Sequence, residues 1–221
     1  MSSRDVILNR VRRALVGGPD GAPDLDAAVD RSYLVEHGAR SVEETVDLLA
    51  ENLADYRAIV HRTDLDGLAE LLARLLAERG ARSVVVPPGL PSGWLEGADP
   101  VRVHDLEAST AQDLDAVDSV VTGCAVAVAE TGTLVLDGSP DQGRRRITLV
   151  PDHHICVVRV PDQVVSSVPQ ALRRLDPARP LTWISGPSAT SDIELDRVEG
   201  VHGPRTLEVV LVTGSPEGHG C

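Results

Sequence analysis

Aromatic residues are almost absent from this chain of 221 residues, which has two tryptophans, two tyrosines and no phenylalanine. A hydrophobic core must therefore be built from valine, leucine, isoleucine and alanine, a set that suits buried parallel strands flanked by helices. Stacking on bases or sugars is correspondingly disfavoured. The 42% of hydrophobic and 25% of charged residues are ordinary for one large domain or two small ones.

Positive charge is also scarce, because 21 Lys and Arg residues face 34 Asp and Glu residues and give a formal net charge of -13. Most of such a surface would repel a phosphate backbone, so we expect no nucleic-acid partner. No apolar run approaches the roughly 20 residues of a membrane span, and the N-terminus lacks a secretory signal. We therefore expect a cytoplasmic protein without a membrane span.

Cysteine is equally rare, and its placement argues against a metal cluster. Cys124, Cys156 and Cys221 are widely spaced and form no CxxC pair. Such spacing fits reduced thiols better than disulfides, zinc sites or iron–sulfur sites. We therefore expect no cluster or other cofactor in this chain.

Histidines beside aspartates invite a metal interpretation in the second half of the chain. His153, His154 and His202 occur with Asp152 and Asp192, and imidazole and carboxylate groups are proper zinc or iron ligands. Their spacing matches no recognised metal motif, so the sequence favours histidines that form hydrogen bonds. We expect no metal site.

The first helix signals lie near the N-terminus. Apolar residues at helical spacing predict a helix over residues 4–16, and the turn-rich, acidic stretch after it is interpreted as a linker or a wrapping arm. Ser41 and Glu44 have the form of a capping box, which predicts a helix over about 41–54. We therefore divide the chain into a helical arm, a main domain and a flexible tail, at residues 1–40, 41–213 and 214–221.

From there, strand and helix signals alternate. A β-rich run at 58–61, an amphipathic helix over 65–75 closed by Gly80 and a valine run at 83–86 make a β-α-β unit. Further apolar runs predict strands at 117–121, 134–136, 147–150, 155–158, 181–184 and 207–212. Because these runs do not alternate with polar residues, both faces should be covered, which predicts a three-layer α/β/α domain with a mostly parallel, mixed sheet. The close spacing of the strands from 134 to 158 predicts that part of the sheet is antiparallel.

Four segments in the second half hold more glycine, hydroxyl residues and charge than a core needs. They are residues 122–136, 149–154, 184–194 and 200–204. Each follows or adjoins a predicted strand, and ligands of open α/β sheets bind beyond the carboxyl ends of strands. We place the candidate site where these segments meet. The absence of GxSxG, GxxxxGKS/T and GxGxxG motifs argues against an α/β-hydrolase, a P-loop NTPase and a Rossmann dehydrogenase.

Glu130 is the main candidate for chemistry. It stands beside Thr131, Gly132 and Thr133, so a carboxylate, two hydroxyls and a glycine that permits close backbone approach are adjacent. This group suits binding of a polar ligand, or a role of Glu130 as acid, base or nucleophile. The alternative is that Glu130 caps or turns the chain between two strands.

Two further groups suit an anion. The backbone N–H groups and hydroxyls of residues 185–192 could cradle one at the start of a helix, and an ordinary turn capped by Ser191 or Asp192 is the alternative. The Arg144–Arg146 cluster could neutralise a carboxylate or phosphate, or form a solvated run of charge. We expect Glu130 and the 185–192 loop to share one pocket.

The blocks TGCAVAVAETGTLVLDG, VPD-H, ISGPSATSDIE and GVHGP, in this order and at these intervals, resemble the LUD-domain family. The resemblance covers roughly residues 40–213. It implies a fold similar to the α/β superfamily of sugar isomerases and CoA transferases. It also implies a role beside iron–sulfur subunits in oxidising L-lactate to pyruvate, with the clusters on those partners.

The resemblance also guides the choice of site residues. The resemblance implies that Glu130 corresponds to the nucleophilic glutamate that CoA transferases of similar fold carry near a glycine, a role that position alone does not establish. The predicted ligand-binding residues are Gly123, Thr131, Gly132, Thr133, Asp152, His153, Ser185, Gly186, Pro187, Ser188, Thr190, Asp192, Glu194, His202 and Gly203.

Three functions remain open at this point. The chain is a subunit or accessory of a lactate-oxidising complex, or a free-standing enzyme that acts on a phosphorylated or CoA-linked acid through Glu130 and the 185–191 loop. The third option is a regulatory protein that binds a small organic acid.

Overall fold

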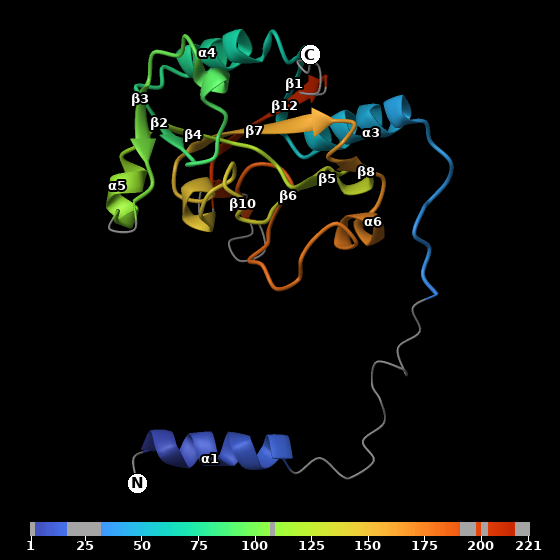
Figure 1. The fold of residues 1–221 in the computed structure, drawn as a ribbon, viewed down its shortest axis with the longest axis vertical. Helices are drawn as coiled ribbons and strands as arrows, with labels where there is room; N and C mark the ends of the chain where they lie inside the picture. The colour runs from blue at the N-terminus through green and yellow to red at the C-terminus, as the bar shows by residue number, and fades with distance from the viewer. Residues whose placement is uncertain (1–2, 17–31, 107–108, 191–197, 200–202, 215–221) are drawn as a thin grey trace, which may run out of the picture. The chain divides into compact units, whose positions relative to one another are not determined.

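The computed structural model describes residues 3–16, 32–106, 109–190, 198–199 and 203–214 (Figure 1). The chain divides into two compact units, Met1–Leu34 and Val35–Cys221. In the first unit, helix α1 spans Ser3–Val16 and confirms the predicted N-terminal helix. No helix in these described residues is long and apolar enough to cross a membrane.

A parallel sheet is the centre of the second unit. Within the described ranges it has six strands in the order β1-β12-β7-β4-β2-β3, all paired in parallel. The strands are β1 Ile59–Asp64, β2 Ser83–Val86, β3 Val101–His104, β4 Ser119–Thr122, β7 His153–Val160 and β12 Thr206–Thr213. The unbroken valine, leucine and isoleucine runs of β2, β4, β7 and β12 are buried, as expected for strands covered on both faces.

Helix α4, Leu68–Glu78, covers one face of this sheet. Its leucines at helical spacing are buried against valines of the sheet such as Val84, Val121 and Val210. The helix begins after Gly67, so the predicted helix is confirmed with its start three residues later than expected.

The other face is covered by a second, smaller sheet and by helix α3, Val42–Asp55. Among the described residues this sheet has the order β8-β5-β6-β9, with β5 Val126–Val128, β6 Thr133–Leu136, β8 Val164–Val165 and β9 Thr182–Ile184. Figure 1 shows α4 on one side of the central sheet, with β5, β6, β8 and the short helix α6, Val168–Leu172, on the other. The three-layer class with a mostly parallel sheet is confirmed, but the antiparallel pairs, β5–β6 and β6–β9, form a separate sheet.

The helix predicted at Ser41 is also confirmed. The Ser41 hydroxyl accepts the backbone N–H of Glu44, and the Glu44 carboxylate accepts the backbone N–H of Ser41, so both halves of the capping box form. A second capping box, of Thr110 with Asp113, begins the short helix α5, Ala111–Asp115.

The strand predicted at 147–150 is wrong. Residues Arg145–Thr148 form the 3₁₀ helix η3 instead, in which the backbone N–H of Ile147 donates to the carbonyl of Arg144 at 3.0 Å. The apolar side chain of Ile147 is buried against Val85 and Leu114. A single turn can thus bury an isolated apolar residue without a strand. Two further 3₁₀ turns are η1 Ser92–Leu95 and η2 Ala129–Thr131, and β10 Ala189–Thr190 pairs with β11 Val198–Glu199.

A buried polar network crosses four neighbouring strands of the central sheet. Ser119 Oγ lies 2.8 Å from Nδ1 of His153, whose Nε2 lies 3.1 Å from Oε1 of Glu208, and Oε2 of Glu208 lies 2.6 Å from Nε2 of His61. Burial raises the pKa of Glu208, but the hydrogen bonds from His153 and His61 outweigh this and hold that pKa below its ordinary value. The network therefore stabilises the folded chain while Glu208 is ionised.

We predict that Glu208→Gln lowers the free energy of unfolding at pH 7 by about 1–3 kcal/mol, because a buried charge-assisted pair is lost. Since the pKa of Glu208 is lowered by folding, its contribution is complete above the ordinary glutamate pKa of about 4.3 and is lost as the pH falls through its folded value. Urea unfolding at pH 7, 5 and 3 should show the wild-type advantage shrinking only at the lowest pH. The control is Glu78→Gln, whose exposed carboxylate lies 3.8 Å from Arg74; an equal loss in both variants would contradict the prediction.

Candidate functional site

A cavity of about 440 Å³ lies where the two sheets approach each other. Its walls come from β9 and the loop after it, from η3, and from the first residues of β7 and β12. The lining residues are Arg145, Thr148, Leu149, His154, Leu181, Thr182, Trp183, Ile184, Ser185, Gly186, Pro187, Ser188, Gly203, Pro204 and Leu207. None of these described residues is an aspartate or a glutamate.

His154 supplies a neutral polar group to this cavity. Its ring is buried, and Nε2 lies 2.8 Å from the hydroxyl oxygen of Thr122. Burial, together with the nearby His153, lowers the pKa of His154 to about 3. The imidazole is therefore uncharged at neutral pH and acts as a hydrogen-bonding group.

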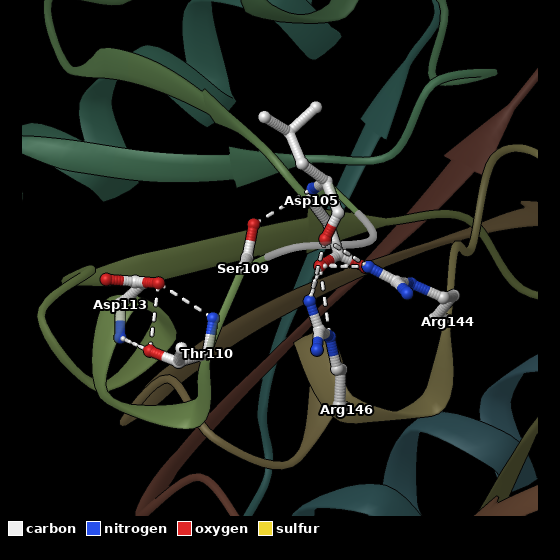
Figure 2. Close-up of polar contacts among 7 residues, drawn as sticks. Asp105, Ser109, Thr110, Asp113, Arg144 and Arg146 are labelled. Atoms are coloured by element: carbon white, nitrogen blue, oxygen red, sulfur yellow. Dashed lines mark hydrogen bonds and ion pairs between the residues drawn. The ribbon is translucent and has the colours of Figure 1, made fainter.

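The arginine triplet is split between two surroundings. Figure 2 shows Arg144 and Arg146 converging on Asp105. Arg144 donates to Asp105 at 2.6 and 2.8 Å, Arg146 donates to the same carboxylate at 3.0 and 2.6 Å, and both reach the carbonyl of Leu106. The Asp105 side chain is only 4% exposed. Burial alone would raise the pKa of Asp105, but the guanidinium groups of Arg144 and Arg146 outweigh this effect and hold the pKa below its ordinary value, so Asp105 stays ionised.

Arg145, between these two arginines in sequence, lines the cavity instead. No ion pair joins its guanidinium to any residue that the structure describes. A neighbouring cavity of about 190 Å³ shares Arg145, Thr148 and Thr182 with the first, and its described lining also lacks acidic residues. Arg145 therefore provides positive charge to both cavities.

Glu130 lies elsewhere and does not line this cavity. Its Oε2 is 2.9 Å from Nδ1 of His37 and its Oε1 is 3.2 Å from the Arg40 guanidinium. Its backbone N–H donates to the carbonyl of Ser166 at 3.0 Å. The sequence led us to expect Glu130 in one pocket with the 185–192 loop, but the structure does not place it in the pocket that residues 185–188 line. Its surroundings match the alternative, in which Glu130 turns the chain between two strands.

The threonines beside Glu130 do connect to the loop. The Thr133 hydroxyl lies 2.8 Å from the hydroxyls of both Thr131 and Ser185. These bonds fix Ser185, a cavity residue, to the start of β6. Thr131 and Thr133 thus help to position Ser185 without lining the cavity themselves.

Two motif glycines allow the second sheet to approach helix α3. Gly132 has a φ of 54°, and a Cβ there would lie 2.7 Å from the backbone carbon of Asn52. Gly186 has a φ of 79°, and a Cβ there would lie 2.2 Å from the carbonyl oxygen of Tyr56, just after α3. Both positions therefore require glycine for conformation and for space.

The remaining predicted residues fall into three groups. Ser185, Gly186, Pro187, Ser188 and Gly203 line the cavity together. Gly123, Asp152 and His153 do not line it, since Gly123 packs against Asp141, Asp152 pairs with Arg205 at 3.1 Å and His153 belongs to the Glu208 network. Thr190 lies in β10, and Asp192, Glu194 and His202 lie outside the described residues.

Sequence reasoning missed several cavity residues. It did not separate Arg145 from its neighbours, and it gave no site role to Thr148 or Leu207. His154 lay in a candidate segment but was not among the predicted ligand-binding residues. Period-two alternation in a strand places His153 and His154 on opposite faces, so that signal could have separated the two histidines. Within the described residues, no group of three or more His, Cys, Asp or Glu side chains is placed to hold a metal ion.

Comparison with known proteins agrees with this architecture. A model of the LUD domain matches residues 46–212. The chain belongs to the LUD-domain family. It is 42% identical to the Lactate utilization protein C of Deinococcus radiodurans over 212 aligned residues, and the alignment covers 93% of each chain. It is 28% identical over 194 residues to the Lactate utilization protein C of Bacillus subtilis, which covers 78% of this chain and 80% of that one.

A solved structure of a similar protein supports the fold. A crystal structure of a DUF162 family protein from Deinococcus radiodurans superposes with a TM-score of 0.68 and 40% sequence identity. It covers 79% of this chain and 99% of that chain. The central sheet flanked by helices is therefore shared with an experimentally determined relative.

We predict that Gly186→Ala destabilises this LUD domain far more than Gly80→Ala. Both glycines have positive φ, but nothing lies within 4 Å of a Cβ at Gly80, so Gly80→Ala should cost only the left-handed strain of about 1–2 kcal/mol. Gly186→Ala adds a clash with the Tyr56 carbonyl and should cost about 1–3 kcal/mol more. Chemical denaturation of both variants measures the difference, and equal losses would show that the approach to α3 is not tight.

Proposed function

We propose that this LUD-domain chain acts in lactate utilisation, as a subunit or accessory of a system that oxidises L-lactate to pyruvate. Relatives over most of its length are called Lactate utilization protein C. The structural observation that carries the proposal is a cavity whose described lining lacks acidic residues and includes Arg145, which forms no ion pair within the described part of the chain. In a chain with a net charge of -13, such a cavity favours an organic anion.

The cavity has the groups that recognition of a carboxylic acid needs. A guanidinium group binds a carboxylate through two parallel hydrogen bonds. The hydroxyls of Thr148, Ser185 and Ser188 and the neutral imidazole of His154 lie in the same lining and suit a hydroxyl or keto oxygen. Both lactate and pyruvate combine a carboxylate with such an oxygen.

Oxidation of lactate also releases two electrons, which we propose pass to iron–sulfur clusters on partner subunits. Cys124 and Cys156 are free, buried thiols of this chain, whereas Cys221 lies outside the described residues. Contact with Cys156, together with burial, raises the pKa of the Cys124 thiol well above its ordinary range. A protonated, buried thiol is a poor cluster ligand, and reduced thiols fit a cytoplasmic location.

A free-standing transferase that uses Glu130 as nucleophile is the competing function. Both carboxylate oxygens of Glu130 are held, one by His37 and one by Arg40, and the side chain is 19% exposed. Hydrogen bonds and ion pairs that stabilise both oxygens reduce the electron density available for attack on a substrate. These contacts support a positioning role for Glu130, in which it fastens the segment before α3 to the turn η2.

Growth of a strain that depends on this chain for use of L-lactate tests the proposal. We predict that Arg145→Gln abolishes or strongly slows growth on L-lactate but not on glucose, because the cavity loses its cation. Arg74→Gln, at an exposed position of α4, removes an equal charge from a residue that does not line the cavity and should grow normally. Glu130→Gln should retain growth.

The outcomes separate the two functions. Normal growth of a folded Arg145→Gln variant would remove the cavity from the function. Loss of growth with folded Glu130→Gln, while Arg145→Gln grows, would instead favour the transferase. Circular dichroism and urea unfolding of each purified variant establish that it is folded.

A further inference from the structure

We propose that the cavity binds a 2-hydroxy or 2-oxo acid whose side chain is larger and more apolar than the methyl group of lactate, with its carboxylate on Arg145. The proposal rests on the proposed function only in placing the functional ligand in this cavity. It goes further by naming the ligand class. The evidence is the size of the cavity, the distribution of charge and the apolar part of the lining.

The first step is size. A volume of about 440 Å³ lies within the range of roughly 300–1,000 Å³ that is typical of pockets for ligands of drug or cofactor size. Lactate has six non-hydrogen atoms and would leave most of this volume to water. Replacing that water with the apolar body of a larger acid is favourable wherever the surrounding wall is apolar.

The second step is where the charge lies. Arg144 and Arg146 are occupied by Asp105, so the triplet offers one guanidinium, that of Arg145. Arg145 and Thr148 come from the single turn η3 and line both cavities. The carboxylate of a bound acid would therefore pair with Arg145 where the two cavities adjoin, and the rest of the ligand would extend into the larger cavity.

The third step is the apolar wall. Leu149 follows η3, Ile184 ends β9 and Leu207 lies in β12, and all three line the larger cavity. A Cβ built on Gly203 would lie 3.9 Å from Cδ2 of Leu149 and 3.6 Å from Cβ of Ser188, so the Leu149 side chain extends to the cavity residues opposite it. An apolar side chain of the ligand would thus meet aliphatic groups.

Titration calorimetry of the purified full chain with a matched series of acids tests this. The probes are L-lactate, L-2-hydroxybutyrate, L-2-hydroxyisocaproate and L-phenyllactate, which share the 2-hydroxy acid group and differ only in their bodies. We expect the affinity to rise by about fourfold for each buried methylene group. L-phenyllactate should therefore bind at least tenfold more tightly than L-lactate.

Three variants separate the two parts of the ligand. Arg145→Gln should weaken every member of the series by about tenfold or more, because a charge-assisted pair is lost. Leu149→Ala should reduce the affinity for L-phenyllactate by about tenfold and leave that for L-lactate unchanged. Arg74→Gln is the charge control and should bind the whole series as the wild type does.

Equal affinity across the series, tightest binding of L-lactate, or no binding of any member would overturn the proposal. So would a rising series that survives Arg145→Gln. Failure here is distinct from failure of the proposed function, because growth on L-lactate can depend on Arg145 even when the series is flat. A rising series that is lost in Arg145→Gln would uphold the ligand class even if growth on L-lactate did not require the chain.

Discussion

Helix α3 meets the second sheet at Gly132 and Gly186, where its last turn and the residue after it leave no space for a Cβ atom. A hydrogen bond of 2.7 Å from the Asn52 amide to the Ala129 carbonyl fixes the same contact. Because β9 and the loop after it continue from this contact into the cavity lining, the position of Ser185 and its neighbours depends on it. The glycines of the two most distinctive motifs are thus explained by packing, and the cavity is a consequence of that packing.

Three consecutive arginines, Arg144 to Arg146, have different surroundings in this protein. Three consecutive arginines would repel one another if they shared one surface, and the turn η3 directs them to different surroundings. Asp105, which directly follows β3 and whose side chain is nearly inaccessible, neutralises Arg144 and Arg146 from a segment about 40 residues earlier in the chain. A strongly acidic chain can therefore present the Arg145 cation to a cavity whose described lining has no acidic residue, because Asp105 pairs with the neighbouring arginines instead.

Much of the fold follows from local patterns in the sequence. The Ser41 capping box, the leucine spacing of α4 and the unbroken valine runs each specify one element, and these were predicted correctly. The site was less accessible to sequence reasoning because it depends on contacts between distant segments. No local pattern around Glu130 indicates His37 or Arg40, which lie 93 and 90 residues before it. No pattern within the triplet distinguishes Arg145 from Arg144. The run at 147–150 was misassigned because short apolar runs have no period that distinguishes a strand from a buried turn.

His153 and His154 show how stability and function divide within one motif. They are adjacent on β7, so their side chains take opposite faces of the central sheet. On one face His153 joins Ser119 to Glu208 and contributes to a charged network that spans four strands. On the other face His154 is kept neutral by burial and lines the cavity. Exchanging the two roles would require the strand to shift by one residue, which would also move the side chains of Ile155 and Val157 to the opposite face of the sheet. The register of β7 therefore sets both the stability of the sheet and the chemistry available to the cavity.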